Sequence, residues 1–197
     1  MVGQLARGTT AAVRALRLPA FALLMTAISW LGLQSALEFG QAAPIWPANA
    51  VVLAVLLSAP RRGWTNWAAA GWAGNFTASL LAGGSPVVAM VLASCNLFEV
   101  AVAYVLIQRF IGRFDPGRVV DLCRFFVLAG GVAPLLSATL AAGALGLMRG
   151  GGSVHQLLEW AAADGLGIVI LTPLLLTLAD LRGRLAATPM TARGALS

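Results

Sequence analysis

The sequence of 197 residues has few charges, no lysine, one histidine and two cysteines. Charged residues make up 10% of the chain, whereas a soluble globular domain carries about a quarter. A chain this poor in charge could not cover its own surface in water, which excludes a soluble domain. One histidine and two cysteines provide neither a zinc ligand set nor a disulfide framework. We therefore expect no metal site, and we interpret Cys95 and Cys123 as small apolar residues.

Motifs of the common enzyme classes are also missing. The sequence has no Walker phosphate loop, no HExxH zinc motif and no GxSxG nucleophile turn. The formal charge of +6 does not indicate a nucleic-acid surface, because the arginines lie between apolar runs and not in one basic stripe. We predict that the chain is not an enzyme, that it has no catalytic residues and no nucleic-acid partner, and that its cofactor, if any, is unknown.

Long apolar runs dominate what the sequence does contain. Hydrophobic residues form 59% of the chain, and the mean hydropathy is +0.87. A membrane-spanning helix needs about 20 apolar residues. Apolar runs of comparable length cover 18–37, 45–59, 64–81, 87–107, 122–147 and 157–178. The sequence thus predicts an all-α integral membrane protein, a bundle of six transmembrane helices. The membrane domain should cover 18–181, between tails at 1–17 and 182–197.

The arginines indicate an orientation for this bundle. If the N-terminus is cytoplasmic, every one of the 13 arginines except Arg149 falls in a cytoplasmic segment. Cytoplasmic segments of membrane proteins are enriched in arginine and lysine. We therefore predict that both termini are cytoplasmic and that the protein crosses the bacterial inner membrane several times.

Some local features modify this plan. Pro47 and Asn49 should make the second helix irregular at its outer end. Glycines 130 and 131 and Pro134 predict a bend in the fifth helix. His155 is expected in a solvated outer loop, and the segment 182–197 is polar and expected to be disordered.

Polar side chains inside the apolar runs are the candidate functional residues. A charge near the bilayer centre costs about 2.5–3.5 kcal/mol, so such a residue usually faces the bundle interior or a water-filled cavity. We predict an interior polar cavity that opens outward and binds a ligand. The predicted cluster consists of Trp46, Asn49, Asn75, Asn96, Glu99, Trp160 and Asp164. As alternatives, asparagines also join helices by hydrogen bonds, and tryptophans also anchor helices at the membrane interface.

Four stretches, taken together, resemble the membrane-associated sensor domain of the first MASE type. They are Ile45-Trp46-Pro47-Ala48, the segment 71–75, Asn96-Leu97-Phe98-Glu99, and Trp160-x-x-x-Asp164-x-x-Gly167 continuing to Pro173. The resemblance covers about 18–178. It implies structural roles for Pro47, Gly71, Gly167 and Pro173, and a sensory module that precedes a cytoplasmic histidine kinase or diguanylate cyclase.

The resemblance leads us to expect a membrane-embedded sensor-like module, and the sequence departs from the family pattern because we expect no catalytic output domain within it. It should bind a ligand or a membrane partner protein and couple to a signalling or larger membrane complex. The expected partners are the lipid bilayer, a membrane protein or cytoplasmic output protein, and a second copy of the chain in a homo-oligomer. Two alternatives stay open. One is a structural accessory subunit of a membrane complex. The other is the substrate-binding subunit of a vitamin-type transporter, for which a helix broken at Pro47 and Asn49 would be typical.

Overall fold

The computed structural model describes residues 2–39, 43–149 and 153–187, and within these ranges the chain is helical with no strand. The helices are α1 (Val2–Phe39), α2 (Pro47–Ser58), η1 (Arg61–Gly63), α3 (Trp64–Leu81), α4 (Pro86–Phe110), α5 (Val119–Val127), η2 (Leu128–Val132), α6 (Ala133–Arg149) and α7 (Val154–Ala187). The segment η2 is π-helical and joins α5 to α6 without a break. The predicted all-helical architecture is therefore confirmed.

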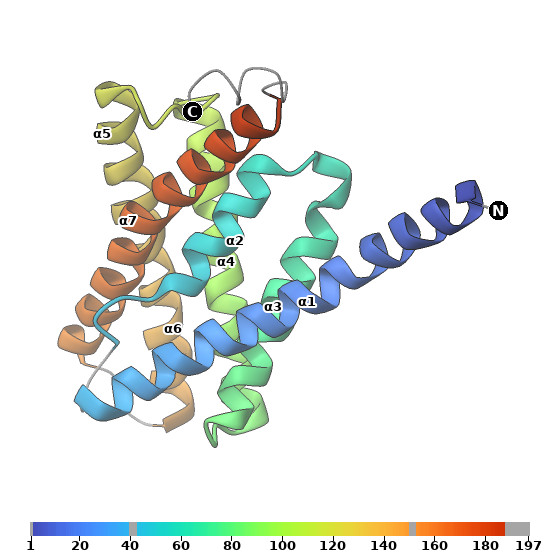
Figure 1. The fold of residues 1–197 in the computed structure, drawn as a ribbon. Coiled ribbons are helices and arrows are strands. Elements are labelled where there is room, and N and C mark those ends of the chain that lie inside the picture. The colour runs from blue at the N-terminus through green and yellow to red at the C-terminus, as the bar shows by residue number, and fades with distance from the viewer. Residues whose placement is uncertain (1, 40–42, 150–152, 188–197) are drawn as a thin grey trace.

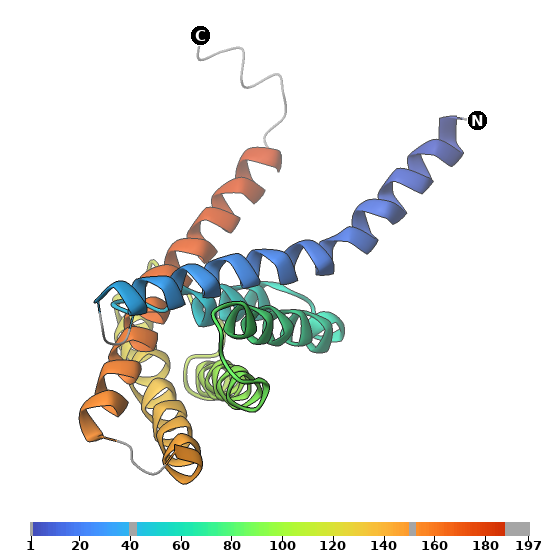
Figure 2. The ribbon, with the colours of Figure 1, turned by 90° about the horizontal axis from the view of Figure 1, so that it is seen from below.

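The helices run alternately up and down through one bundle (Figure 1). The α2–α3 and α4–α5 connections lie at the upper end of this view, and the α3–α4 turn lies at the lower end with the start of α7. Figure 2 shows α1 crossing one side of the bundle, with α3 between α1 and α4. Helix α2 packs on α7, α4, α3 and α1, so it lies among these four helices.

Four helical segments are long and apolar enough to cross a membrane: Leu16–Leu37, Pro86–Phe110, Val119–Met148 and Val154–Leu185. Helix α2 is apolar but has 12 residues, which is about 18 Å at 1.5 Å per residue and less than a bilayer core of about 30 Å. Each apolar run of the sequence corresponds to a helix, or to α5, η2 and α6 together. The chain is therefore a multi-pass membrane protein, and the count of six spans stays a prediction.

The second helix differs from expectation at its start. Pro47 does not interrupt the helix; it occupies the first turn, and Trp46 before it has extended backbone (φ −106°, ψ 97°). Proline is well tolerated in the first helical turn, because the N–H that it lacks would have no partner within the helix. The helix therefore begins regularly at Pro47, where we expected it to be irregular. The described helix α2 contains no break of the kind that would have favoured a transporter.

The ends of the chain and the outer loop also differ from expectation. The helix α1 already includes residues 2–17, and α7 continues through Arg182 to Ala187, where we expected a disordered tail. The remainder of that tail, 188–197, lies outside the described residues. His155 belongs to the first turn of α7 and not to a loop.

Glycines let helix backbones approach closely at several crossings, as is common in membrane bundles. A Cβ atom on Gly74 would lie 2.8 Å from the Ala22 carbonyl oxygen, so α1 and α3 touch there. Gly130 in the π-helical segment and Gly165 in α7 meet backbone to backbone. The predicted bend of the fifth helix is therefore a π-helical segment that rests on α7.

Candidate functional site

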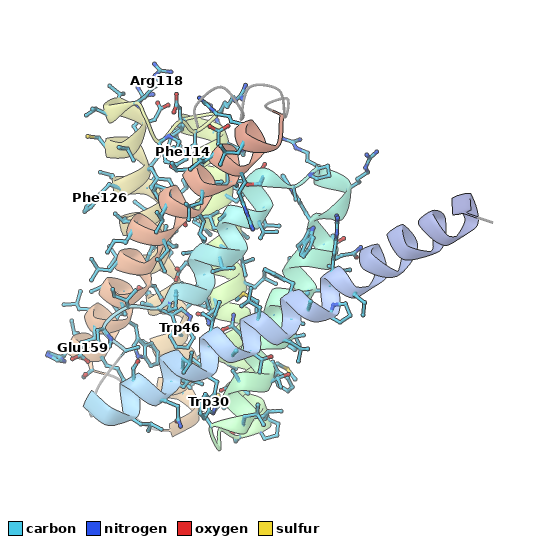
Figure 3. The ribbon with its side chains drawn as sticks, viewed as in Figure 1. Trp30, Trp46, Phe114, Arg118, Phe126 and Glu159 are labelled. Atoms are coloured by element: carbon cyan, nitrogen blue, oxygen red, sulfur yellow. The ribbon has the colours of Figure 1, made fainter. Side chains whose placement is uncertain are left out.

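A cavity of about 710 Å³ lies between α1, α3, α4, α6, α7 and the segment before α2. It occupies the end of the bundle where α7 begins, since Ser153, His155 and Gln156 line it. Figure 3 shows Trp46 and Glu159 at the lower end of the molecule and Arg118 at the upper end. The cavity and this arginine therefore lie at opposite ends of the bundle.

The structure brings most of the predicted cluster to this cavity. The lining includes Trp46, Asn75, Asn96, Trp160 and Asp164. Asn49 and Glu99 do not line it; they are 1% and 0% exposed and lie behind it. The predicted residues thus divide into a cavity wall and a buried layer beneath.

The buried layer is a polar network centred on Glu99 of α4. Its Oε1 accepts a hydrogen bond from Asn49 Nδ2 at 3.0 Å, and the same Asn49 amide lies 3.5 Å from Asn96 Oδ1. The carboxyl group of Asp164 lies near enough to that of Glu99 for the two to interact directly. Through Asn96 and Asp164, which line the cavity, the buried Glu99 is connected to the cavity wall.

The network leaves some polar atoms without a partner. Glu99 Oε2 and Asn49 Oδ1 are buried and accept no hydrogen bond from the described residues. Leaving a buried acceptor unpaired costs about 1–3 kcal/mol, and more when the group is charged. Such groups are rare in native structures and are concentrated at functional sites. The arrangement around Glu99 is therefore more polar than helix packing alone requires.

Asn75 of α3 both joins two helices and lines the cavity. Its Oδ1 accepts a hydrogen bond from Ser29 Oγ of α1 at 2.7 Å, and its side chain also lines the cavity. The oxygen of this amide thus joins α1 to α3, which is the interhelical hydrogen bonding that we gave as the alternative role of the asparagines. The amide also contributes polar surface to the cavity.

Trp46 is held from several sides. Its backbone N–H donates to the Ala163 carbonyl oxygen at 3.0 Å, and its ring lies where a Cβ atom on Gly32 would be, 2.8 Å from Cζ3. The backbone of Gly167 lies directly against that of Trp46. The indole Nε1 is buried and has no partner among the described residues. Glycines on α1 and α7 therefore fix this tryptophan in the cavity wall.

The residues with expected structural roles each occupy a defined position. Pro47 begins α2, and Gly167 makes room for Trp46. A Cβ atom on Gly71 would lie 2.8 Å from Val52 Cγ2, so this glycine brings α3 close to α2. Pro173 lies inside α7, next to Thr172, whose hydroxyl donates to the Ala50 carbonyl oxygen at 3.3 Å.

Sequence reasoning missed the contribution of the first turns of α7. His155, Gln156 and Glu159 line the cavity, and His155 Nδ1 lies 3.4 Å from Glu159 Oε1. They were missed because the helix was expected to begin at residue 157. The signal was present in the sequence as a capping box, Ser153-x-x-Gln156, in which Ser153 Oγ accepts from the Gln156 backbone N–H at 3.1 Å.

Small hydroxyl groups were missed as well. Ser79 and Ser137 line the cavity, and Ser137 Oγ donates to the Cys95 carbonyl oxygen at 2.9 Å. Cys95 is buried, as expected for a small apolar residue, whereas Cys123 is exposed. Within the described residues, no group of three or more His, Cys, Asp or Glu side chains could hold a metal ion.

The helices, their hydropathy and the polar cavity within them define an integral membrane protein with an interior polar cavity. A family model for MASE1 matches residues 16–192, nearly the whole chain. The chain belongs to the MASE1 family, whose members are membrane-associated sensory modules and not catalytic domains. The predicted resemblance is thereby confirmed. No curated protein and no solved structure matches the chain significantly.

Proposed function

We propose that this chain is a six-spanning sensory module of the bacterial inner membrane that binds a small ligand in its cavity. Both termini would be cytoplasmic, the cavity would open outward, and ligand binding would shift α7 to signal to a cytoplasmic output domain or partner. The observation that carries the proposal is the cavity of about 710 Å³, because ligand sites in proteins typically have volumes of about 300–1,000 Å³ and a few convergent polar groups.

The distribution of arginines supports the orientation. Arg61 and Arg62 lie in the α2–α3 connection, and Arg113 and Arg118 lie in the α4–α5 connection, both at the upper end of the bundle (Figure 1). Since cytoplasmic segments are rich in arginine, this end is assigned to the cytoplasm. The cavity lies at the other end and would then face outward.

Packing supports six spans although α2 is short. Ala48, Ala50 and Leu53 of α2 are fully buried, so the other helices enclose this helix and shield it from lipid. Non-helical backbone at membrane depth is tolerated where protein covers it. The extended backbone at Trp46, which donates its N–H to Ala163, meets this condition.

Helix α7 provides the path for a signal. It carries Asp164 and Trp160 in the cavity wall and continues without interruption to Ala187 beyond the other end of the apolar segment. A ligand that contacts this helix differently in two states would change their populations. The π-helical segment η2 rests on α7 at Gly165, so a shift of α7 would be transmitted to the helix α5–η2–α6 at this contact.

The experiment joins the chain in frame to a cytoplasmic diguanylate cyclase domain and modifies a cysteine in the cavity from outside. Ala36 lines the cavity and is replaced by cysteine in a background without native cysteines. A membrane-impermeant thiol reagent should label Ala36→Cys in intact cells. The attached reagent then occupies the cavity, and it should change the rate at which the fused cyclase produces cyclic dinucleotide.

Val154→Cys is the matched control, because Val154 is 74% exposed near the same end of the bundle and does not line the cavity. Labelling there should leave the output unchanged. Failure to label Ala36→Cys from outside would refute the outward opening. Complete labelling without any change in output would refute the sensory role of the cavity.

A further inference from the structure

The walls of the cavity have an uneven charge. Asp164 and Glu159 contribute carboxyl groups, and none of the described residues that line the cavity is an arginine. His155 is the basic residue among the described residues that line the cavity, and it lies beside Glu159 with its side chain 75% exposed. Its Nδ1 lies 3.4 Å from Glu159 Oε1, and none of the ion pairs among the described residues involves the carboxyl group of Asp164 or Glu99.

From this we infer that the cavity binds a small organic cation that carries an ammonium group. The inference deepens the proposed function, on which it rests, by naming the chemical class of the ligand. An ammonium group placed beside Asp164 would lie next to its carboxyl group and near that of Glu99, with which Asp164 interacts, and would stabilise their ionised forms.

The buried Glu99 is the independent sign of a ligand. Glu99 is 0% exposed, and its Oε2 has no hydrogen-bond partner among the described residues. The side chains next to its carboxyl group include Asn49 behind it, and Asp164 and Ser137, which line the cavity. The ionised form of a carboxyl group in a low-dielectric interior is costly without a countercharge, and none of the described residues next to Glu99 supplies one. A cation at the Asp164 side of the cavity would stabilise that ionised form.

Helix dipoles do not reverse this preference. Helices α2, α4 and α7 begin at the cavity end of the bundle, and α1, α3 and α6 terminate there. The partial positive charges of helix N-termini and the partial negative charges of C-termini, each about half a unit, therefore largely cancel at this end. The side-chain carboxyl groups determine the sign of the local field.

Aromatic rings complete the site. The indoles of Trp46 and Trp160 line the same cavity as Asp164. Tryptophan is the aromatic side chain that attracts a cation most strongly, and cages of aromatic rings with carboxylates recognise ammonium groups. The cavity volume of about 710 Å³ accommodates an organic cation larger than an inorganic ion.

The test measures binding to the full chain in lipid nanodiscs by isothermal titration calorimetry. The probes are choline and phenethylamine, each with a neutral partner of similar shape (dimethylbutanol, phenylethanol) and an anionic one (dimethylbutyrate, phenylacetate). At least one cation should bind ten or more times more tightly than its neutral and anionic partners. Asp164→Asn should lower the affinity for that cation at least tenfold, which corresponds to about 1.4 kcal/mol of binding free energy.

Asp180→Asn is the control on the same helix, since Asp180 pairs with Arg184 at 2.8 Å and does not line the cavity. It should keep the cation preference. If Asp164→Asn does not fold, as judged by gel filtration and circular dichroism, Ala36→Cys provides a second measurement with Asp164 intact. A cationic methanethiosulfonate should then react at least tenfold faster than an anionic one, relative to their rates with a free thiol.

Two results separate this inference from the proposed function. Equal or better binding of the neutral or anionic partners, with equal reaction rates at Ala36→Cys, would overturn the ammonium ligand and leave the sensory role intact. Cation binding that depends on Asp164, combined with a fused cyclase that does not respond when the cavity is occupied, would overturn the sensory role and leave the ligand class in place.

Discussion

Replacement of Gly167 by alanine adds one methyl group where α7 meets the backbone of Trp46. A Cβ atom at this position would lie 2.8 Å from the Trp46 carbonyl carbon and closer still to its oxygen. Carbon atoms in van der Waals contact are about 3.5–4.0 Å apart. The two segments would therefore have to separate by an appreciable fraction of an ångström.

The surroundings prevent Trp46 from moving away at low cost. Its N–H is bonded to Ala163 at 3.0 Å, its ring packs against Gly32, and the next residue already begins α2. Overpacking of a core costs about 1–3 kcal/mol, and the upper part of that range applies when the obstacle is backbone rather than a flexible side chain. Alanine is favoured over glycine inside a helix by about 0.8–1.0 kcal/mol, which offsets part of this cost. We expect Gly167→Ala to lower the free energy of unfolding by about 2 kcal/mol, which is roughly a 30-fold change in the unfolding equilibrium.

Gly183→Ala is the control on the same helix. Gly183 is exposed, and nothing lies within 4 Å of a Cβ atom built on it. Alanine is favoured over glycine in a helix by about 0.8–1.0 kcal/mol. This substitution should therefore stabilise the protein slightly, so the same chemical change should have opposite signs at Gly167 and Gly183.

The measurement is reversible unfolding in mixed micelles by increasing sodium dodecyl sulfate, followed by far-ultraviolet circular dichroism. Tryptophan fluorescence recorded in the same titration reports the average surroundings of the six tryptophans, Trp46 among them. A Gly167→Ala protein whose stability lies within about 0.5 kcal/mol of the parent would refute the close contact between α7 and Trp46. The same conclusion would follow if both substitutions changed the stability equally.

Other predictions concern the buried network and the orientation of the bundle. Asn49→Ala removes the donor that lies 3.0 Å from Glu99 Oε1, and should destabilise the protein by about 1–3 kcal/mol because a buried acceptor loses its partner. The same dodecyl sulfate titration tests this, and a loss below the average of about 0.6 kcal/mol for interhelical hydrogen bonds would contradict it. In a background without native cysteines, Ser153→Cys should react with an impermeant maleimide in intact cells, whereas Arg62→Cys and Arg118→Cys should react only after the membrane is permeabilised. Labelling of Arg62→Cys and Arg118→Cys from different sides would disprove the topology.

The sequence alone determined the class of the protein and the positions of its helices. Lipid offers no hydrogen bonds to the backbone, so an apolar run of sufficient length must become a helix whatever its neighbours do. For this reason the run predicted at 87–107 lies within α4, Pro86–Phe110, which is long and apolar enough to cross a membrane. The motifs around Trp46, Asn96 and Asp164 were sufficient to indicate the MASE1 family, which the family model confirms.

Helix boundaries were predicted less well where local signals competed. Pro47 was expected to disturb a helix that it in fact begins, and Ser153 was not recognised as the cap of α7. Both signals are local, so a closer reading of first-turn proline and of the capping box would have found them. The extension of α7 through Arg182 was missed because its last turns are polar and lack the apolar pattern of a span.

Only the tertiary structure decided which polar groups meet. Asn49 and Glu99 are 50 residues apart in the sequence, and their hydrogen bond depends on how α2 and α4 are rotated about their axes. That rotation is set by close contacts such as those at Gly71 and Gly167, where the absence of a side chain lets one helix approach another. Hydropathy along the chain carries no information on these contacts. The division between a buried Glu99 and an Asp164 in the cavity wall therefore appears only when the helices are packed together.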